Sequence, residues 1–308
     1  MNGSRAVPSD RPVRGLLCVD KPVGITSHDV VANVRRAART KRVGHAGTLD
    51  PFATGLLVIA VGACTRLLPY VQGEPKVYEA LIRFGQETDT DDRTGTVVRH
   101  AATPAALGWP VPLPEAIASL TGDVLQVPPA FSAKHVDGHR AYALARRGVE
   151  VVLEPVPVAV HRWDVLDRDD NAVRVRITCR GGTYVRALAR DLGRALRSAA
   201  HCEALRRVSS GAASVDASVS MAALEPGSIA DGRVALHAPL AFLAPMAHVP
   251  LDAPALEALA HGRSLAATHQ GARAALLRDG DVVGIADRVR DQSGARWQPR
   301  VVLLNGDA

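Results

Sequence analysis

Residues 44–55, which read Gly-His-Ala-Gly-Thr-Leu-Asp-Pro-Phe-Ala-Thr-Gly, constrain the fold more than any other part of the chain. The stretch holds three glycines, and Asp50 stands directly before a proline. Glycine permits positive φ and close backbone approach, whereas proline fixes its own φ and forces the preceding residue into an extended conformation. The aliphatic run at residues 56–61 is typical of a buried strand. The pattern therefore predicts a loop that presents Asp50 immediately before a core strand.

The composition is that of a globular protein with a basic surface. A length of 308 residues allows one large domain or two unequal domains, and 47% hydrophobic residues suffice to bury a core. The net charge of +6 comes from arginine far more than from lysine, and guanidinium groups bind phosphate in a bidentate manner. A polyanionic partner such as nucleic acid is therefore favoured, although many basic proteins bind none.

Four cysteines are spread along the chain without the spacing of a metal or redox motif. Cys18, Cys64, Cys179 and Cys202 lie mostly among apolar neighbours, and no Cys-x-x-Cys or paired-histidine pattern occurs. We therefore expect buried thiols in a reducing compartment, with neither disulfides nor a zinc site. The sequence also lacks an apolar run of about 18 residues and a signal peptide, so we expect a cytoplasmic protein that does not span a membrane.

Hydrophobic periodicity predicts an α+β protein. After a disordered tail at residues 1–14, strands are expected at residues 15–20, 56–61, 76–84, 149–153, 156–165, 173–179 and 201–208. Helices are expected after a cap at Thr26 or Ser27, near residues 114–120, at residues 140–147, and from a cap at Thr183 to residue 196. Residues 226–245 are punctuated by proline and glycine and are predicted to form a linker. The pattern after residue 248 predicts a small, mostly β domain with a helix at residues 253–260.

Two charged segments allow more than one interpretation. The helix after Thr26 ends in a basic cluster of Arg35, Arg36, Arg39, Lys41 and Arg42. These side chains are either solvated charges favoured by the helix dipole or a ridge that contacts phosphates. The acidic run at residues 89–95 resembles a calcium loop, but His100 stands where an EF-hand loop requires glutamate. We predict that this run forms a solvated turn.

The residues that carry chemistry are few. His45 and Asp50 occupy the glycine-rich loop, and no second acidic residue, serine–histidine constellation, Walker loop or Gly-x-Gly-x-x-Gly motif lies near them in sequence. This pattern argues against glycosidase, hydrolase, ATPase and dehydrogenase chemistry. Tyr78 and Tyr184, two of only four tyrosines, either stack on nucleic-acid bases or fill the core. A lone carboxylate in basic surroundings remains.

The loop and several other blocks resemble one known family. Residues 44–57 are similar to the signature of the TruB family of tRNA pseudouridine synthases. Further blocks typical of the family occur in the same order: Asp20-Lys21-Pro22-Val23-Gly24, Lys76-Val77-Tyr78, Pro128-Pro129 with Phe131-Ser132-Ala133, Gly182-Thr183-Tyr184-Val185-Arg186 with Asp191-Leu192-Gly193, and Leu205-Arg206-Arg207. The resemblance covers about residues 15–225, with one departure at Ala199-Ala200, where glycine is expected. The stretch after residue 248 resembles the small RNA-binding PUA domain.

The resemblance implies a fold and a domain organisation. We expect the pseudouridine synthase fold, with a mixed and largely antiparallel central sheet, in a catalytic domain at residues 15–240. An insertion at about residues 124–150 is expected to grip RNA, and residues 245–308 are expected to form a PUA-like domain. A monomer is expected because no heptad repeat or other assembly signature occurs.

The implied activity is the isomerisation of uridine 55 in the T-loop of tRNA to pseudouridine, without metal, nucleotide or organic cofactor. The C1′–N1 bond breaks, the uracil turns, and a C1′–C5 bond forms after the base has been flipped out of the folded tRNA. Asp50 matches the catalytic aspartate, which acts as a nucleophile at C1′ or C6 or as a base that gives a glycal. Arg186 matches its cationic partner, so we expect these two side chains to meet.

Further residues receive roles from the same resemblance. Tyr184 matches the residue placed for the C5 proton, and Tyr78 matches the residue that stacks on the target base. Substrate-binding roles are expected for His45, which contacts displaced loop nucleotides, for Leu205, which lines the pocket, and for Lys21, Gly47 and Thr48. Two other functions stay open: an RNA-binding or RNA-folding module, and a related synthase that acts on another RNA.

Overall fold

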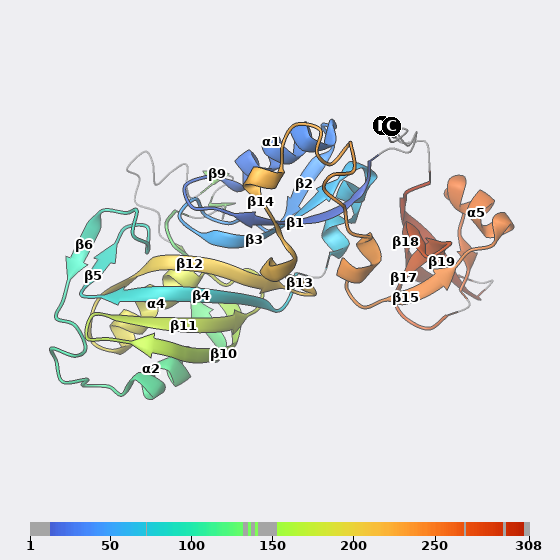
Figure 1. Cartoon of the computed structure of the whole chain (residues 1–308). Coiled ribbons are helices and arrows are strands. Elements are labelled where there is room, and N and C mark those ends of the chain that lie inside the picture. Colours follow the sequence, from blue (N-terminus) through green and yellow to red (C-terminus); the bar gives the residue numbers. More distant parts are fainter. Residues whose placement is uncertain are drawn as a thin grey trace, which may run out of the picture.

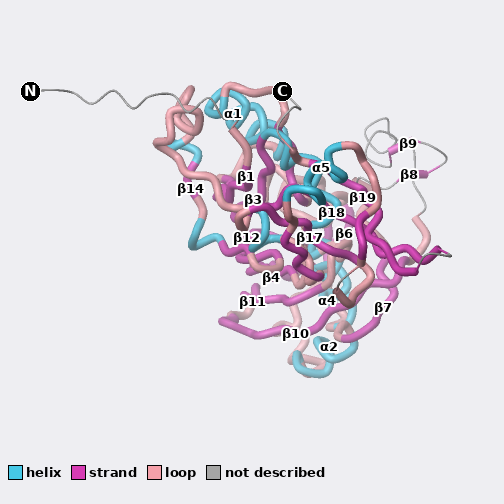
Figure 2. Tube along the Cα trace, turned by 90° about the vertical axis from the view of Figure 1, so that its right-hand side faces the viewer, coloured by secondary structure: helices cyan, strands magenta, loops and turns pink. Residues whose placement is uncertain are grey.

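Two large β-sheets dominate the part of the chain that the structure describes, with two further two-stranded sheets, short helices and turns around them (Figure 1). The computed structural model describes residues 13–71, 73–131, 153–267, 269–291 and 294–304, together with the backbone of residues 135, 136, 139 and 140. Its helices are α1 (Ser27–Ala38), α2 (Leu113–Ser119), α4 (Val185–Ala195) and α5 (Ala253–Ala260), with 3₁₀ segments at Gly62–Tyr70, Val215–Ala217, Met221–Ala223 and Pro239–Phe242. Figure 2 shows the strands of the larger sheet between α1 at one end and α2 at the other. The predicted α+β class is confirmed.

The larger sheet has ten strands, in the order β14-β1-β3-β12-β4-β11-β10-β7, with β2 paired to β3 and β13 to β12. They are β1 (Gly15–Lys21), β2 (Val43–Ala46), β3 (Thr54–Val61), β4 (Lys76–Phe84), β7 (Gly122–Gln126), β10 (Val156–Arg168), β11 (Ala172–Cys179), β12 (Ala200–Ser210), β13 (Ala213–Ser214) and β14 (Val219–Ser220). Within this sheet β14 pairs with β1 and β12 with β3 in parallel, and the other pairs are antiparallel. The predicted mixed, largely antiparallel sheet is confirmed.

The sheet narrows at its middle, where β3 and β12 share two residue pairs, Thr54 with Arg206 and Gly55 with Arg207. On one side of this junction, alternate residues of β3 pack against α1 and against residues of the smaller sheet, which is formed by residues 247–302. Both faces of β3 are therefore buried. This double burial explains the unbroken aliphatic run at residues 56–61, because a strand with two buried faces needs no polar positions.

On the other side of the junction, α4 covers one face of β12, β4, β11 and β10, and lies behind these strands in Figure 1. Tyr78, Ala80 and Ile82 of β4 are buried in the apolar cluster that includes residues of α4. Glu79 and Leu81 alternate with them and lie on the opposite face. We call this face the rear face because it points away from α4. The two faces of this half of the sheet thus have different surroundings.

The start of α4 differs from its prediction. The N-cap residue is Tyr184 and not Thr183, and no side chain of the N-cap residue bonds to the helix. Instead, the backbone N–H of Tyr184 donates to the side-chain oxygen of Gln126 at 2.9 Å. The hydrogen-bond acceptor for this N–H therefore comes from β7. This strand lies in a proline-rich stretch for which only a helix was predicted.

The segment between β5 (Gln86–Thr88) and β6 (Val97–His100) corrects the prediction of a solvated turn. Asp91 and Asp92 are buried, with 5% and 4% of their surface exposed. Asp91 pairs with Arg190 at 2.8 Å, and Asp92 lies 3.5 Å from Arg186. Both arginines belong to α4, so the acidic run is buried because a helix from a distant part of the sequence supplies its counter-charges.

Residues 224–243 pack onto the larger sheet and do not form the linker that was predicted. Leu224, Ile229 and Val234 are buried in one apolar cluster with α1. His237 exchanges backbone hydrogen bonds with Leu16 of β1, at 2.7 and 3.0 Å. Proline and glycine mark turns in this segment, but its apolar side chains complete the core.

The smaller sheet has the order β15-β17-β18-β19-β16. Its strands are β15 (Ala247–Pro250), β16 (Leu265–Ala266), β17 (Arg273–Arg278), β18 (Asp281–Asp291) and β19 (Gly294–Val302), and α5 begins and ends at the predicted residues. Arg14 and Arg66 donate to the carbonyls of Leu303 and Val302, both at 2.8 Å. One apolar cluster contains residues of both sheets, so the sheets share part of their core.

Some predictions fall wholly or mostly outside the described residues. These are the helix at residues 140–147, the strand at residues 149–153 and most of the expected insertion. Within the insertion, the structure describes the pairing of β8 (His135–Val136) with β9 (His139–Arg140). The four cysteines are buried free thiols, as expected. Within the described ranges, no helix is long and apolar enough to cross a membrane.

Candidate active site

The Asp50 loop, residues 47–55, depends on glycine at both ends. Gly47 adopts a φ of +93° and Gly55 a φ of +98°, in the left-handed region that side chains disfavour. At Gly55 a Cβ atom would lie 2.3 Å from the carbonyl oxygen of Arg207, so glycine is required for β3 to approach β12. Between these ends, Ser27 Oγ donates to the carbonyl of Leu49 at 3.2 Å and accepts from its N–H at 3.0 Å. Helix α1 therefore fixes the residue directly before Asp50.

Lys21 supports the Asp50 loop from inside the protein. The side chain is fully buried, and Nζ donates to the carbonyls of Ile25 at 2.8 Å, Pro22 at 3.0 Å and Pro51 at 3.4 Å. Burial lowers the pKa of Lys21 to about 8, although the nearby Asp50 carboxylate favours the charged form. This position corrects the expectation of a substrate contact, because an ammonium enclosed by carbonyls presents no surface to RNA.

Arg207 holds the same loop from β12. Its guanidinium is buried and donates to the carbonyl of Leu56 at 2.8 Å, of Gly47 at 3.1 Å and of Thr48 at 3.4 Å. The carbonyl groups of Gly47 and Thr48 thus accept hydrogen bonds within the protein. Thr48 itself is exposed to solvent. The sequence offered one sign of this role, because Arg207 closes a family block, but it did not show that the block reaches the Asp50 loop.

Asp50 and Arg186 form the ion pair that the resemblance led us to expect. Asp50 Oδ2 lies 2.9 Å from Arg186 Nε. The arginine side chain is 5% exposed, whereas the aspartate side chain is 40% exposed. The cation is therefore fixed in the protein, and the carboxylate faces an open side where a substrate can reach it.

Arg186 has three further partners that hold its guanidinium in place. Nη1 donates to the carbonyl of Thr90 at 2.7 Å, and Nη2 donates to the carbonyl of Phe131 at 3.1 Å. Nη1 also lies 3.5 Å from Asp92 Oδ2. Sequence reasoning missed Asp92, because the acidic run that contains it was interpreted as a solvated turn.

Asp92 is fixed by the turn that contains it. Its Oδ1 accepts from the hydroxyl of Thr90 at 2.9 Å and from the N–H and hydroxyl of Thr94 at 2.9 and 2.6 Å. The carboxylate therefore has hydrogen bonds on one oxygen and the Arg186 cation beside the other. A buried charge with such partners acts as a fixed element of the site.

Tyr184 is held through its backbone, which leaves its side chain for other contacts. The side-chain amide of Gln126 accepts from the Tyr184 N–H at 2.9 Å and donates to the Tyr184 carbonyl at 3.1 Å. Gln126 is 1% exposed. Because Gln126 satisfies both backbone groups, it sets the position of Tyr184 two residues before Arg186.

Tyr78 and Leu205 lie in one buried cluster with Leu49 and Phe52 of the Asp50 loop. Burial raises the pKa of the Tyr78 hydroxyl, although the nearby Arg207 guanidinium opposes this effect. Tyr78 is therefore a neutral aromatic side chain at neutral pH. It adjoins the Asp50 loop.

His45 lies on β2, before the Asp50 loop. Its ring stands nearly perpendicular to that of His28, with 5.9 Å between the ring centroids. Burial lowers the pKa of His45, and the positive charges of His28 and Arg207 act in the same direction. Its buried Nδ1 has no hydrogen-bond partner in the described part of the chain.

The site thus combines one partly open carboxylate, a fixed guanidinium and neighbouring aromatic side chains. Such a carboxylate can act as a nucleophile or as a base. No group of three or more histidine, cysteine, aspartate or glutamate side chains suited to a metal ion occurs among the described residues.

Solved structures share this fold over most of the chain. A chain of the Cbf5-Nop10-Gar1 complex aligns with a TM-score of 0.65 at 21% identity, over 98% of this chain and 91% of that chain. A chain of an H/ACA RNP bound to a substrate RNA containing 2′-deoxyuridine aligns with a TM-score of 0.63 at 20% identity, over 94% and 85%. At such identities the likeness establishes the fold, which is that of the pseudouridine synthases.

Sequence comparison identifies the family. The family described as TruB family pseudouridylate synthase (N terminal domain) matches residues 35–185. The tRNA pseudouridine synthase B of Nocardia farcinica is 41% identical over 308 residues, which are 98% of this chain and 97% of the relative. That of Geobacter sulfurreducens is 42% identical over 288 residues, or 89% and 93% of the two chains. The chain therefore belongs to the TruB family and is an enzyme of the pseudouridine synthase class.

Proposed function

We propose that this chain isomerises uridine 55 in the T-loop of tRNA to pseudouridine. The observation that carries the proposal is the pairing of Asp50 with Arg186 at 2.9 Å, in which the arginine is buried and the carboxylate is partly open. Relatives named tRNA pseudouridine synthase B support tRNA as the substrate. The T-loop and position 55 rest on the resemblance of residues 44–57 to the family signature.

Asp50 supplies the carboxylate of the reaction. A carboxylate must be ionised to act as a nucleophile or as a base, and the adjacent Arg186 cation favours that form. The ion pair uses Oδ2, which leaves Oδ1 for the substrate. Attack at C1′, attack at C6 and proton abstraction to a glycal all require the same open oxygen.

The neighbouring side chains receive the flipped base. Tyr78 stacks on the uracil, Leu205 forms a wall of the pocket, and Tyr184 handles the C5 proton. Tyr78 suits a stacking role because its hydroxyl stays protonated. His45, whose lowered pKa leaves the ring neutral, contacts the displaced loop nucleotides as a hydrogen-bonding or stacking group.

Binding of the whole tRNA must offset the cost of extruding the base, which is a few kcal/mol. We assign this to the basic end of α1, to the insertion at about residues 124–150, and to a PUA-like domain at residues 245–308 beside the catalytic domain at residues 15–240. Arg39 of the basic end is paired with Asp231 at 2.8 Å, so part of that charge is balanced within the protein. The enzyme is proposed to act in the cytoplasm as a monomer.

The decisive experiment measures pseudouridine in a T-arm hairpin, with a hairpin that carries cytidine at the target position as the control. Asp50→Asn is expected to fold, to bind the hairpin and to form no pseudouridine. The matched control Asp279→Asn changes a carboxylate in the turn before β18 and keeps full activity. Full activity of Asp50→Asn would refute the proposal. Equal promotion of tRNA folding by Asp50→Asn and the wild type would indicate a separate role in RNA folding.

A further inference from the structure

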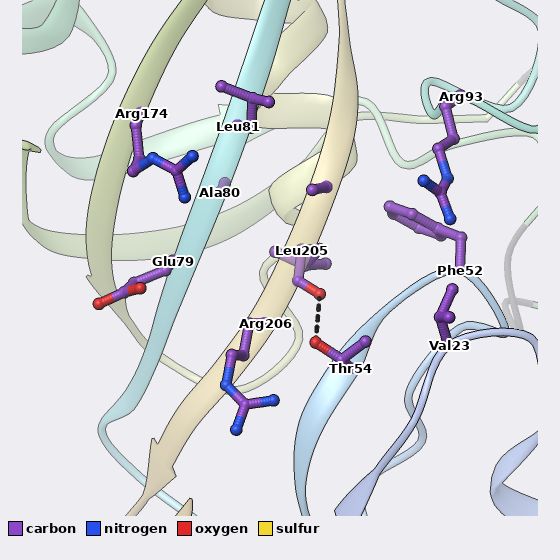
Figure 3. A pocket seen from close by; sticks show the side chains of 11 residues that line it. Val23, Phe52, Thr54, Glu79, Ala80, Leu81, Arg93, Arg174, Leu205 and Arg206 are labelled. Atoms are coloured by element: carbon purple, nitrogen blue, oxygen red, sulfur yellow. Dashed lines mark hydrogen bonds between the residues drawn. The ribbon is translucent and has the colours of Figure 1, made fainter. Parts of the chain in front are cut away.

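A pocket of about 290 Å³ opens on the rear face of the larger sheet, and we call it the rear pocket (Figure 3). Glu79, Arg174 and Arg206 border it from β4, β11 and β12. Figure 3 shows Phe52 and Arg93 on the opposite side, beyond the hydrogen bond from Thr54 to the carbonyl of Leu205. The rear pocket therefore lies at the narrow junction where β3 leaves β12.

Two arginines of the rear pocket have free binding capacity. Arg206 is engaged by Asp20 at 2.7 and 3.0 Å, and Glu79 by Arg176 at 2.6 Å. Arg93 and Arg174 are exposed, and neither has a carboxylate within ion-pair distance among the residues that the structure describes. The pocket thus presents two guanidinium groups to an anion.

The rest of the lining is largely apolar, with Val23, Phe52, Leu81 and Ala204 between the charged residues. Guanidinium groups bind phosphate oxygens and also stack on bases, and apolar side chains bury the face of a base. The volume of about 290 Å³ is just below the range for small-ligand pockets, which is about 300–1,000 Å³. One nucleotide matches this combination of size, charge and apolar surface, whereas a base pair exceeds it.

The rear pocket and the ion pair are built by the same two segments. Phe52 lies in the Asp50 loop, and Arg93 directly follows Asp92. Asp50 and Asp92 both turn toward Arg186 on α4, whereas Phe52 and Arg93 border the pocket. A ligand in the rear pocket therefore contacts Phe52 and Arg93, which belong to the two segments that place carboxylates at Arg186.

We propose that the rear pocket binds one nucleotide of the tRNA outside the T-arm, through Arg93 and Arg174. Asp50 is turned toward Arg186 of α4, whereas Arg93 and Arg174 border the rear face, so the rear pocket takes a nucleotide other than the target uridine. A full tRNA carries further arms that can extend around the edge of the sheet. The choice of tRNA as the source rests on the proposed function.

The test compares the affinities of full-length tRNA and of the T-arm hairpin for the double variant Arg93→Gln/Arg174→Gln. The matched control is Arg83→Gln/Arg162→Gln, which removes two exposed arginines of β4 and β10 that pair with Glu203 and Asp164 outside the pocket. We expect the rear-pocket variant to bind tRNA on the order of tenfold more weakly and to bind the hairpin as the wild type does. The salt dependence of tRNA binding should lose a slope of about 1, as for one phosphate contact.

Three outcomes overturn the proposal. The first is an equal loss of affinity for tRNA and for the hairpin, and the second is an equal loss in the control variant, because either indicates general electrostatics. The third is unchanged tRNA affinity, even if the variant loses binding of uridine 5′-monophosphate, which would make a free nucleotide the ligand. Pseudouridine formation in the hairpin by the wild type tests the proposed function separately. Thermal unfolding of each variant confirms that it is folded.

Discussion

Asp50 and Asp92 share one guanidinium, because both carboxylates meet Arg186, at 2.9 and 3.5 Å. The two aspartates differ in burial, with side chains 40% and 5% exposed. Asp92 has no open side, so it fixes the arginine, and the arginine in turn fixes Asp50. The Asp50 carboxylate is thus held through Arg186 by a buried turn on the other side of the cation.

Loss of the charge at Asp92 should slow the reaction without weakening RNA binding. In Asp92→Asn the Arg186 cation loses a fixed partner, and small displacements in an active site reduce rates by a factor on the order of 10². We expect a fall of this order in the single-turnover rate of pseudouridine formation, with the hairpin affinity unchanged. Asp89→Asn is the matched control, because Asp89 is exposed in the same turn and accepts from the Thr96 N–H. A wild-type rate in Asp92→Asn would show that Arg186 does not need this partner.

Replacement of Gln126 should affect both stability and rate. Gln126→Met leaves the N–H of Tyr184 without its partner, whereas the Tyr184 carbonyl keeps the hydrogen bond from the Leu188 N–H at 3.1 Å. A buried polar group left unpaired costs about 1–3 kcal/mol. We expect the free energy of unfolding in urea to fall by about 1–3 kcal/mol, and the single-turnover rate to fall because Tyr184 is displaced. Leu125→Ala changes the neighbouring residue, which is 74% exposed, and should alter neither quantity. Equal behaviour of the two variants would contradict a positioning role for Gln126.

Local constraints made the Asp50 loop predictable from sequence. Its glycines, the proline after Asp50 and the aliphatic run act over a few residues, and the structure shows the two left-handed glycines and the doubly buried strand β3. The contact with Arg186 was expected only from the family resemblance, since no local pattern connects residues so far apart in the chain. The position of α4 over the sheet brings them together.

The missed features depend on partners from distant segments. Asp92 was interpreted as solvated because an acidic run is normally exposed, and the arginines of α4 that bury it are invisible to a local pattern. Lys21 was assigned to the substrate from the family resemblance, whereas three carbonyls of its own turn and of the Asp50 loop enclose it. In both residues a charged side chain is buried with its partners.

The pKa of Lys21 predicts a pH dependence of stability. This pKa is about 8 in the folded protein, lowered mainly by burial, and close to 10.5 in the unfolded chain. Between these values the unfolded chain binds more protons, so the contribution of Lys21 to the free energy of unfolding increases as the pH rises from about 8 to about 10.5. The unfolding free energy of the wild type minus that of Lys21→Met should therefore become more positive over this range. The exposed Lys41, changed to Met, gives the reference, and parallel pH profiles for the two variants would contradict the prediction.

Gly55 should be the most sensitive glycine of the Asp50 loop, because conformation and space both require it. Its φ is +98°, and an added Cβ would lie 2.3 Å from the carbonyl oxygen of Arg207, a backbone atom that moves only with β12. Gly122 isolates the first effect, since its φ is +93° and no atom lies within 4 Å of an added Cβ. In urea unfolding, Gly122→Ala should cost about 1–2 kcal/mol, the penalty for a side chain in left-handed backbone.

Gly55→Ala should cost clearly more, at about 4 kcal/mol or above, because the strands must separate as well. That separation displaces the Asp50 loop, so the rate of pseudouridine formation per folded molecule should fall in Gly55→Ala and stay unchanged in Gly122→Ala. Equal losses of stability in the two variants would show that β12 yields to the added methyl group. The narrow junction of β3 and β12 would then not be what holds Asp50 in place.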